Sequence, residues 1–291
     1  MKTEFKNVVI FLGPLLILPA LFVIWPLIEL MVLSLKHKVI LFEIDRWAGL
    51  ENYQYLLGKD ARFWGALGNT LYFTVYSVGL ELVLGLMFAL YLRFGKESAW
   101  IKVILLLPWA IPNVVSARLW QWMLHPEVGI INHVLLTLGW INEPVLWLSD
   151  PTLALNAAIL ADIWKTTPLI TLLLFAGLQR IPETILSAAK VDRTPPVRFL
   201  FYILLPQLNP MLMTAMILRG LDAFRVFDVI YVMTGGGPAN STETLSIYAY
   251  RTYFQSLQFG YGSSIALTQV ILMLAMTWII MNAFSSKWDR S

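Results

Sequence analysis

The chain alternates long apolar segments with shorter polar ones. Six of the apolar segments are long enough for a helix that crosses a membrane, which needs about 20 residues. They lie at about Val8–Leu35, Asn69–Leu92, Val103–Met123, Thr152–Leu178, Phe199–Leu221 and Ser263–Phe284. The polar connections between them are too short to hold a second soluble domain. The pattern therefore predicts an all-α polytopic membrane protein in which residues 1–291 form a single transmembrane domain.

The first apolar segment has one alternative interpretation, a cleaved secretory signal, because Lys2 and Lys6 precede it. The apolar core of a signal is about 7–15 residues long and ends in small residues. Here the uncharged run extends from Val8 to Ile28 and resumes after Glu29. We therefore expect a retained first transmembrane helix.

The composition also favours a membrane protein. Hydrophobic residues make up 58% of the chain and charged residues 13%, whereas an ordinary soluble domain has about 25% charged residues. The net charge of +3 is too small to indicate a nucleic-acid partner, so none is expected. The chain has no cysteine, and the spacing of its three histidines is not that of metal ligands, so no metal site is expected.

The sequence contains none of the common catalytic motifs. Gly58-Lys59-Asp60 and Gly95-Lys96-Glu97 lack the hydroxyl residue and the upstream glycine of a phosphate-binding loop. Neither His-Glu-x-x-His nor Gly-x-Ser-x-Gly occurs. We therefore expect a protein that is not an enzyme, with no catalytic residues and no cofactor of its own.

The distribution of Lys and Arg predicts the orientation, because cytoplasmic loops carry an excess of both. With the N-terminus in the cytoplasm, eleven of these residues lie inside and seven lie outside. The stretch from Gln121 to Pro151 contains neither, which favours placing it outside. We expect both termini to be cytoplasmic.

Several ionisable residues fall inside the expected spans, where they are costly unless they face a polar interior or pair with one another. They are Glu81, Arg118, Asp162, Lys165, Arg219 and Asp222. Asp162 and Lys165 are three residues apart, and so are Arg219 and Asp222, so the members of each pair share a helix face. These four residues could line a binding pocket or form structural ion pairs. Glu81 is better explained as structural, and so is Arg118.

Two polar motifs stand between the later spans. The first contains Ser187-Ala188-Ala189 and Asp192-Arg193 and is followed by Leu205-Pro206. The second runs from Leu221 to Tyr231 and leads into Gly235-Gly236-Gly237-Pro238. In this order, and with these apolar segments around them, they resemble the permeases of ATP-driven (ABC) sugar importers of the maltose and trehalose type. The resemblance covers nearly the whole chain. It implies the type I importer permease fold, with six transmembrane helices and a cytoplasmic coupling helix.

In that family the first motif forms a coupling helix that fits a groove on a cytoplasmic ATPase. The resemblance places the coupling loop at about residues 179–198. The residues that it assigns to ATPase coupling are Thr184, Ser187, Ala188, Ala189, Asp192 and Arg193. Two of them depart from the family pattern. Ser187 stands where the family usually has Glu, and Arg193 stands where it usually has Gly, at an expected tight turn.

The same resemblance places the sugar pocket on the fourth and fifth spans. The matching residues are Asp162, Trp164, Lys165, Thr166, Arg219, Asp222 and Ala223. Their carboxylates would accept hydrogen bonds from sugar hydroxyls, their cations would donate, and Trp164 could stack on a pyranose ring. The loop Gly235, Gly236, Gly237 and Pro238 would lie outside, at the channel mouth or against the binding protein. A plain connecting turn is the alternative for this loop.

The family also implies partners. They are a second homologous permease, a cytoplasmic ATPase dimer that binds ATP and Mg, an extracytoplasmic sugar-binding protein and the lipids of a bacterial inner membrane. The implied substrate is a disaccharide, with trehalose or maltose favoured. Glycerol phosphate or another polyol derivative is an alternative, but Asp162 and Asp222 offset Lys165 and Arg219, which favours a neutral sugar. A stand-alone secondary transporter would require inverted repeats and a membrane enzyme a catalytic cluster, and neither is evident in the sequence.

Overall fold

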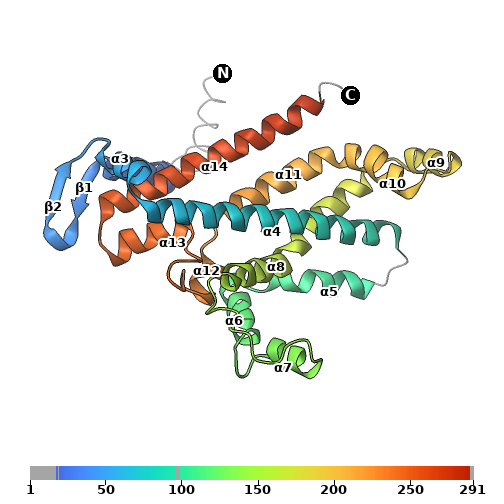
Figure 1. Ribbon diagram of the computed structural model, residues 1–291. Coiled ribbons are helices and arrows are strands. Elements are labelled where there is room, and N and C mark those ends of the chain that lie inside the picture. Colours follow the sequence, from blue (N-terminus) through green and yellow to red (C-terminus); the bar gives the residue numbers. More distant parts are fainter. Residues whose placement is uncertain (1–17, 19, 96–98, 289–291) are drawn as a thin grey trace, which may run out of the picture. The chain divides into compact units, whose positions relative to one another are not determined.

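A computed structural model describes residue 18, residues 20–95 and residues 99–288 of the chain (Figure 1). The described chain is mostly helical, as expected. Its long helices are α4 (Ala61–Phe94), α8 (Leu153–Gln179), α11 (Leu205–Phe224) and α14 (Phe259–Trp288). The shorter helical elements are η1 (Ala20–Ile24), α2 (Trp25–Ser34), η2 (Ile40–Phe42), α3 (Glu51–Gly58), α5 (Ala99–Ala110), α6 (Asn113–Met123), α7 (Ile130–Thr137), α9 (Glu183–Val191), α10 (Pro196–Arg198), η3 (Phe199–Leu204), α12 (Asp228–Met233), α13 (Leu245–Tyr250) and η4 (Arg251–Gln255).

Four described segments are long and apolar enough to cross a membrane. They are Ala61–Phe94, Leu153–Gln179, Pro196–Met233 and Phe259–Phe284. They correspond to the second, fourth, fifth and sixth expected spans. The first expected span begins among residues 1–17 and 19, outside the described residues, and its described part consists mainly of η1 and α2.

The third expected span is not one straight helix. Its two parts, Val103–Ala110 and Asn113–Met123, meet at a bend of 101°. Pro112 explains the break, because proline has no N–H for the helical ladder and its backbone here is extended, with φ −57° and ψ 145°. The bent pair can be a broken span or a re-entrant loop. The described residues therefore contain four spans, or five with the bent pair, while part of the first expected span lies outside them.

The chain divides into two compact units, of which the first combines Met1–Trp64 with Tyr248–Ile271. Its described part contains an antiparallel hairpin of β1 (Lys36–Val39) and β2 (Ile44–Trp47), with Lys36 opposite Trp47. The sequence pattern does not predict this hairpin, because strands of four residues give too short an alternation to recognise.

Asp60 connects the two sequence segments of this first unit. Its Oδ1 accepts hydrogen bonds from the backbone N–H groups of Arg62 at 2.9 Å and Phe63 at 3.1 Å, which caps the start of α4. Its Oδ2 accepts from the hydroxyl of Tyr248 at 2.6 Å and from that of Tyr261. Burial and the bond to Asp60 raise the pKa of Tyr248, so this phenol remains a donor even under alkaline conditions that would ionise an ordinary tyrosine.

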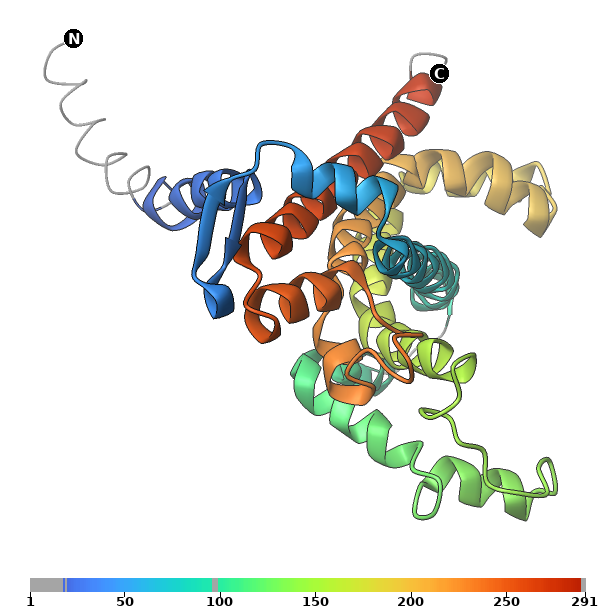
Figure 2. The same cartoon turned by 60° about the vertical axis from the view of Figure 1, so that its left-hand side comes forward.

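The second unit consists of Gly65–Ile247 and Leu272–Ser291 and contains both motifs. Its helices α4, α8 and α11 can be followed from two directions in Figures 1 and 2. Two glycines allow them to pack closely. A Cβ added at Gly85 of α4 would lie 2.6 Å from Ile170 of α8, and one at Gly177 of α8 would lie 2.7 Å from Met211 of α11. Small residues permit this close approach between membrane helices, and it brings polar side chains of the three helices together.

Candidate functional site

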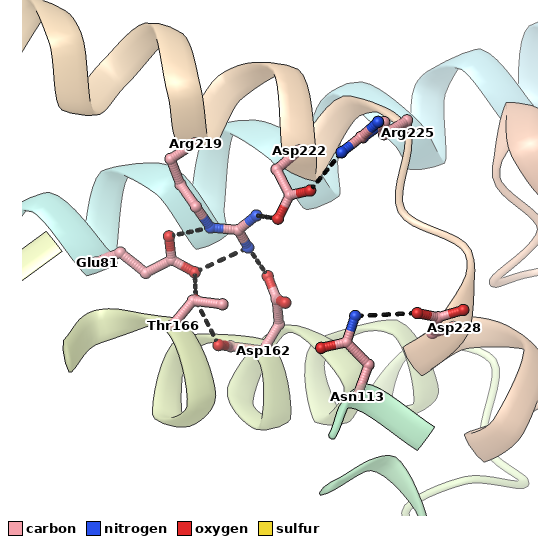
Figure 3. A network of polar contacts seen from close by, with 8 residues as sticks. All are labelled: Glu81, Asn113, Asp162, Thr166, Arg219, Asp222, Arg225 and Asp228. Atoms are coloured by element: carbon pink, nitrogen blue, oxygen red, sulfur yellow. Dashed lines mark hydrogen bonds and ion pairs between the residues drawn. The ribbon is translucent and has the colours of Figure 1, made fainter. Parts of the chain in front are cut away.

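Arg219 on α11 is the centre of a charged cluster at the expected pocket (Figure 3). Its Nε donates to Oε2 of Glu81 at 2.6 Å, and its Nη2 donates to Oε1 of the same carboxylate at 3.0 Å. Nη2 also donates to Oδ2 of Asp162, and Nη1 donates to Oδ2 of Asp222 at 3.2 Å. The guanidinium presents a planar fork of donors, so one side chain binds carboxylates from α4, α8 and α11 at once.

The cluster has a buried end and an open end. The side chain of Glu81 is 0% exposed and that of Arg219 is 4% exposed, whereas Asp222 is 57% exposed. Buried ion pairs persist only where further hydrogen bonds satisfy them. Thr166 supplies one, because its hydroxyl lies within hydrogen-bonding distance of both the Glu81 carboxylate and the Asp162 carbonyl oxygen. Glu81 is therefore enclosed in the bundle, and Asp222 is the carboxylate that a ligand can reach most easily.

A cavity of about 230 Å³ lies at this open end. The ionisable residues in its described lining are Asp162, Lys165, Arg219, Asp222, Arg225 and Asp228. Three are carboxylates and three are cations, so their formal charges cancel. Arg225 donates to Oδ1 of Asp222 at 3.3 Å, and the Asn113 amide donates to Oδ2 of Asp228 at 2.9 Å (Figure 3). The cavity thus presents many hydrogen-bonding groups without an excess of either charge.

Five of the seven residues that the family resemblance assigns to the pocket line this cavity. They are Asp162, Lys165, Thr166, Arg219 and Asp222. The other two lie elsewhere. Trp164 packs edge-to-face against Trp120, with ring centroids 6.0 Å apart, and Ala223 is fully buried in the core.

The ion pairs differ in part from those that the sequence spacing suggests. Arg219 and Asp222 do pair, but Asp162 pairs with Arg219 and not with Lys165. Within the described residues, Lys165 has no carboxylate closer than 4.0 Å, although Asp162 and Asp222 lie near enough to interact with it electrostatically. The ammonium group of Lys165 is thus an available donor in the cavity lining. Arg118 is exposed on α6 and donates to Gln121 at 2.6 Å.

Of the cavity residues that sequence reasoning missed, four are polar: Asn113, Ser116, Arg225 and Asp228. Arg225 follows Asp222 at a spacing of three, so a helical projection of the second motif could have found it. Asp228 belongs to the same motif. Asn113 gave no such signal, because it reaches the cavity only through the bend at Pro112. Among the described residues, no group of three His, Cys, Asp or Glu side chains is placed to hold a metal ion.

The expected coupling helix is α9 (Glu183–Val191), and it has two different faces. Leu186 and Ala189 are 4% and 6% exposed and pack against their own chain. The opposite face and the end of the helix are open, with Val191 82% exposed. The exposed residues of this helix and its end are Glu183, Thr184, Ser187, Ala188, Lys190, Val191, Asp192 and Arg193. Of the Ala188-Ala189 pair, only Ala188 is on the open face.

Arg193 ends this helix in a conformation that glycine usually supplies. Its φ is +46°, in the left-handed region. Its N–H donates to the carbonyl of Lys190 at 3.1 Å, and the N–H of Thr194 donates to that of Ala189 at 3.0 Å. This pair of bonds is the Schellman arrangement. The tight turn expected from the family pattern is thus present, and an arginine occupies its left-handed position.

The glycine loop after α12 is a hydrogen-bonded turn. Gly235 and Gly236 have φ values of +62° and +95°, which side-chain-bearing residues adopt only at a cost. The hydroxyls of Thr234 and Thr242 lie 2.7 Å apart, and Thr242 donates to the carbonyl of Gly237 at 2.7 Å. The glycines therefore permit a compact turn that the flanking threonines hold closed.

A multi-pass helical protein with a polar cavity between its spans and a short two-faced helix at their ends has the layout of a membrane transport subunit. Residues 81–288 match the family described as "Binding-protein-dependent transport system inner membrane component". The chain belongs to this family, whose members are permease subunits of ABC transporters and not enzymes.

Several curated relatives and solved structures support this assignment. The chain is 41% identical to the trehalose/maltose transport system permease protein MalF of Thermococcus litoralis, with 91% of each chain covered. It is 34% identical to the sulfoquinovosyl glycerol transport system permease protein SmoG of Agrobacterium fabrum, over 96% of this chain and 90% of the relative. It is 36% identical to the trehalose transport system permease protein SugA of Mycobacterium tuberculosis, over 82% of this chain and 75% of the relative.

The fold matches that of a bacterial ABC transporter involved in the import of the acidic polysaccharide alginate. The TM-score is 0.84 at 20% sequence identity, with 98% of each chain covered. A second structure of an alginate transporter, in complex with an alginate pentasaccharide-bound periplasmic protein, has a TM-score of 0.79 at 21% identity. The expected importer permease fold is thereby confirmed.

Proposed function

We propose that this chain forms half of the translocation pathway of an ATP-driven importer and carries a neutral disaccharide, with trehalose or maltose preferred. The observation that carries the proposal is the charge-balanced cavity. Three carboxylates and three cations provide acceptors and donors for sugar hydroxyls, whereas a phosphate would favour a cationic excess. The trehalose and maltose names of two relatives point the same way. A phosphorylated polyol is the second candidate cargo.

A second, homologous permease would complete the pocket. Ligand sites usually measure about 300–1,000 Å³, and the cavity here is smaller, at about 230 Å³. Its most accessible carboxylate, Asp222, lies at the open end. We propose that the matching surface of a partner permease covers this opening, and that rocking of the two permeases exposes the sugar to each side in turn.

The open face of α9 would dock on a cytoplasmic ATPase that binds ATP and Mg. Small residues allow close approach at Ser187 and Ala188, and the exposed Val191 provides apolar area to bury. On the other side of the membrane, a sugar-binding protein would deliver the substrate near the turn formed by Gly235, Gly236, Gly237 and Pro238. Both termini would lie in the cytoplasm of a bacterial cell.

This orientation can be tested directly, because the chain has no cysteine. Single cysteines at Asn142 and at Arg180, both exposed, should react with a membrane-impermeant maleimide from opposite sides, with Asn142 labelled from outside. Labelling of both from the same side would contradict the proposed topology.

The substrate is tested with the assembled transporter in proteoliposomes, together with its binding protein. Trehalose, maltose, sucrose and glycerol 3-phosphate are compared as stimulators of ATP hydrolysis and as transported solutes. We expect stimulation by trehalose or maltose. Stimulation by glycerol 3-phosphate alone would overturn the neutral-sugar proposal, and uptake without ATPase or ATP would indicate a secondary transporter.

A further inference from the structure

A second cavity, of about 510 Å³, lies behind the coupling helix. The end of α4, the inner face of α9 and the start of the span Pro196–Met233 all contribute to its lining. Its cations are Arg93, Lys190 and Arg193. Among its described lining residues Glu183 is the single carboxylate, and it already pairs with Arg93. The cavity therefore has a cationic excess, in contrast to the charge-balanced cavity at Asp222.

The rest of the lining is largely apolar. Phe94, Leu186 and Phe199 belong to it, and the rings of Phe94 and Phe199 meet edge-to-face with centroids 6.2 Å apart. A site with cations beside aromatic and aliphatic surface fits an amphipathic anion better than a small soluble one.

Two membrane spans end at this cavity. Arg93 directly follows the apolar stretch Asn69–Leu92, and Phe199 begins the apolar stretch Phe199–Leu221. The helix α4 has 34 residues, which at about 1.5 Å per residue is longer than the hydrocarbon core of about 30 Å. Its last residues therefore reach the level of the lipid headgroups. Since both spans change from apolar to polar here, the cavity lies at that level too.

The Arg93 side chain has donor capacity that Glu183 does not use. Its Nη2 donates to Glu183, and its guanidinium carbon lies 5.4 Å from the ring centre of Phe94. Its Nε is buried and has no hydrogen-bond acceptor in the part of the chain that the structure describes. A buried donor without an acceptor calls for an explanation, and a phosphate oxygen is a strong acceptor for a guanidinium.

We infer that this cavity binds an anionic phospholipid, with the phosphate at Arg93 and Lys190 and the acyl chains against Phe94 and Phe199. Basic pockets between spans are known headgroup sites. The lipid and the ATPase would then contact different sides of α9, since Leu186 and Lys190 line the cavity while Ala188 does not, and Arg193, at the end of the helix, is both exposed and in the lining. A bound lipid would hold the coupling helix against its own bundle. Lipid binding is inferred from the cavity only. Its effect on coupling depends in addition on the proposed function.

Native mass spectrometry of the purified transporter tests the binding step without sugar or ATP. The protein is equilibrated with equal amounts of phosphatidylglycerol and phosphatidylcholine, and the retained lipids are counted. We expect preferential retention of phosphatidylglycerol. Each basic residue contributes about 1 kcal/mol near an anionic lipid, so Arg93→Gln and Lys190→Gln should each lower the preference about fivefold. The matched control is Arg198→Gln, which removes an exposed cation of α10 that is not in the lining and should leave the preference unchanged.

Three results would overturn the lipid site. They are equal retention of both lipids by the parent, an equal loss in Arg198→Gln, and displacement of phosphatidylglycerol by inorganic phosphate that also stabilises the lipid-free protein. The last result would identify a soluble-anion site. If the Arg93→Gln transporter does not assemble, the lipid preference of the Lys190→Gln variant tests the site by itself, because Lys190 is exposed and its substitution should not disturb folding.

The effect on coupling has a separate readout, ATP hydrolysis in nanodiscs with and without phosphatidylglycerol. We expect the anionic lipid to change sugar-stimulated turnover in the parent, and to change it less in Lys190→Gln. An unchanged rate with intact lipid binding would refute the effect on coupling and leave the site standing. Failure of sugar stimulation itself would instead count against the proposed function.

Discussion

Arg219 and Glu81 are 138 residues apart in the sequence, yet their side chains form a bidentate ion pair between α11 and α4. Asp162 of α8 binds the same guanidinium. One cation therefore joins three spans at the buried end of the cluster, while its fourth nitrogen–oxygen contact, to Asp222, faces the cavity at 3.2 Å. This division separates residues that hold the helices from residues that can meet a ligand.

Glu81→Gln should destabilise the protein by about 3 kcal/mol, because it removes one charge of a buried pair and leaves Arg219 undercompensated. Thermal unfolding of the purified protein measures this loss. Asp222→Asn is the matched control. Its carboxylate is 57% exposed and pairs with the same arginine, so solvent screening limits the expected loss to less than about 1 kcal/mol. Equal losses in the two variants would contradict the division between buried and open ends.

Asp222→Asn should instead weaken sugar handling. A hydrogen bond to a charged group contributes about 1.5–3 kcal/mol, so its loss should raise the sugar concentration for half-maximal ATPase stimulation about tenfold or more. Glu143→Gln removes an exposed carboxylate outside the cavity lining and should leave that concentration unchanged. Parental sugar dependence in a well-assembled Asp222→Asn transporter would exclude Asp222 from the pocket.

Asp162→Asn tests whether the Asp162 carboxylate binds the sugar or only forms a structural ion pair with Arg219. Asp162 lines the cavity and also pairs with buried Arg219, so the two roles predict different results. Stable assembly with a weakened sugar response indicates a ligand contact. Poor thermal stability with unchanged sugar preference in the protein that remains indicates a structural ion pair. Since its side chain is only 13% exposed, we expect the loss of stability to be the larger effect.

The sequence predicted four of the long apolar spans and five of the fourteen described residues that line the cavity. Long apolar segments predict helices reliably because the bilayer requires internally bonded backbone. The break at Pro112 escaped detection, since prolines are tolerated in many membrane helices and only the local backbone decides whether one bends the chain. The pairing of Asp162 with Arg219 escaped for another reason. Spacing along one helix reveals neighbours on that helix, whereas this pair forms between α8 and α11.

Ala188→Glu and Ala189→Glu should separate docking from folding. Ala188 is on the open face of α9, so a glutamate there should leave stability unchanged and abolish sugar-stimulated ATP hydrolysis by filling a close-packed interface. Ala189 is 6% exposed within its own chain, so the same substitution there should lower thermal stability, because it buries a charge. Full stimulated turnover in Ala188→Glu would mean that the ATPase docks elsewhere.

Arg193→Gly should stabilise the end of the coupling helix. Arg193 has φ +46°, and a side chain in the left-handed region costs about 1–2 kcal/mol. Glycine removes this cost but gains freedom in the unfolded chain, so a net gain of about 0.5–1 kcal/mol is expected. Amide hydrogen exchange of residues 189–194 should slow about two- to fivefold.

Lys190→Gly is the matched control, because position 190 lies inside α9, where glycine costs about 1 kcal/mol and exchange should accelerate. The comparison is made without anionic lipid, since both residues line the second cavity. Faster exchange in Arg193→Gly would mean that contacts of the arginine side chain, and not the backbone turn, hold this end of the helix.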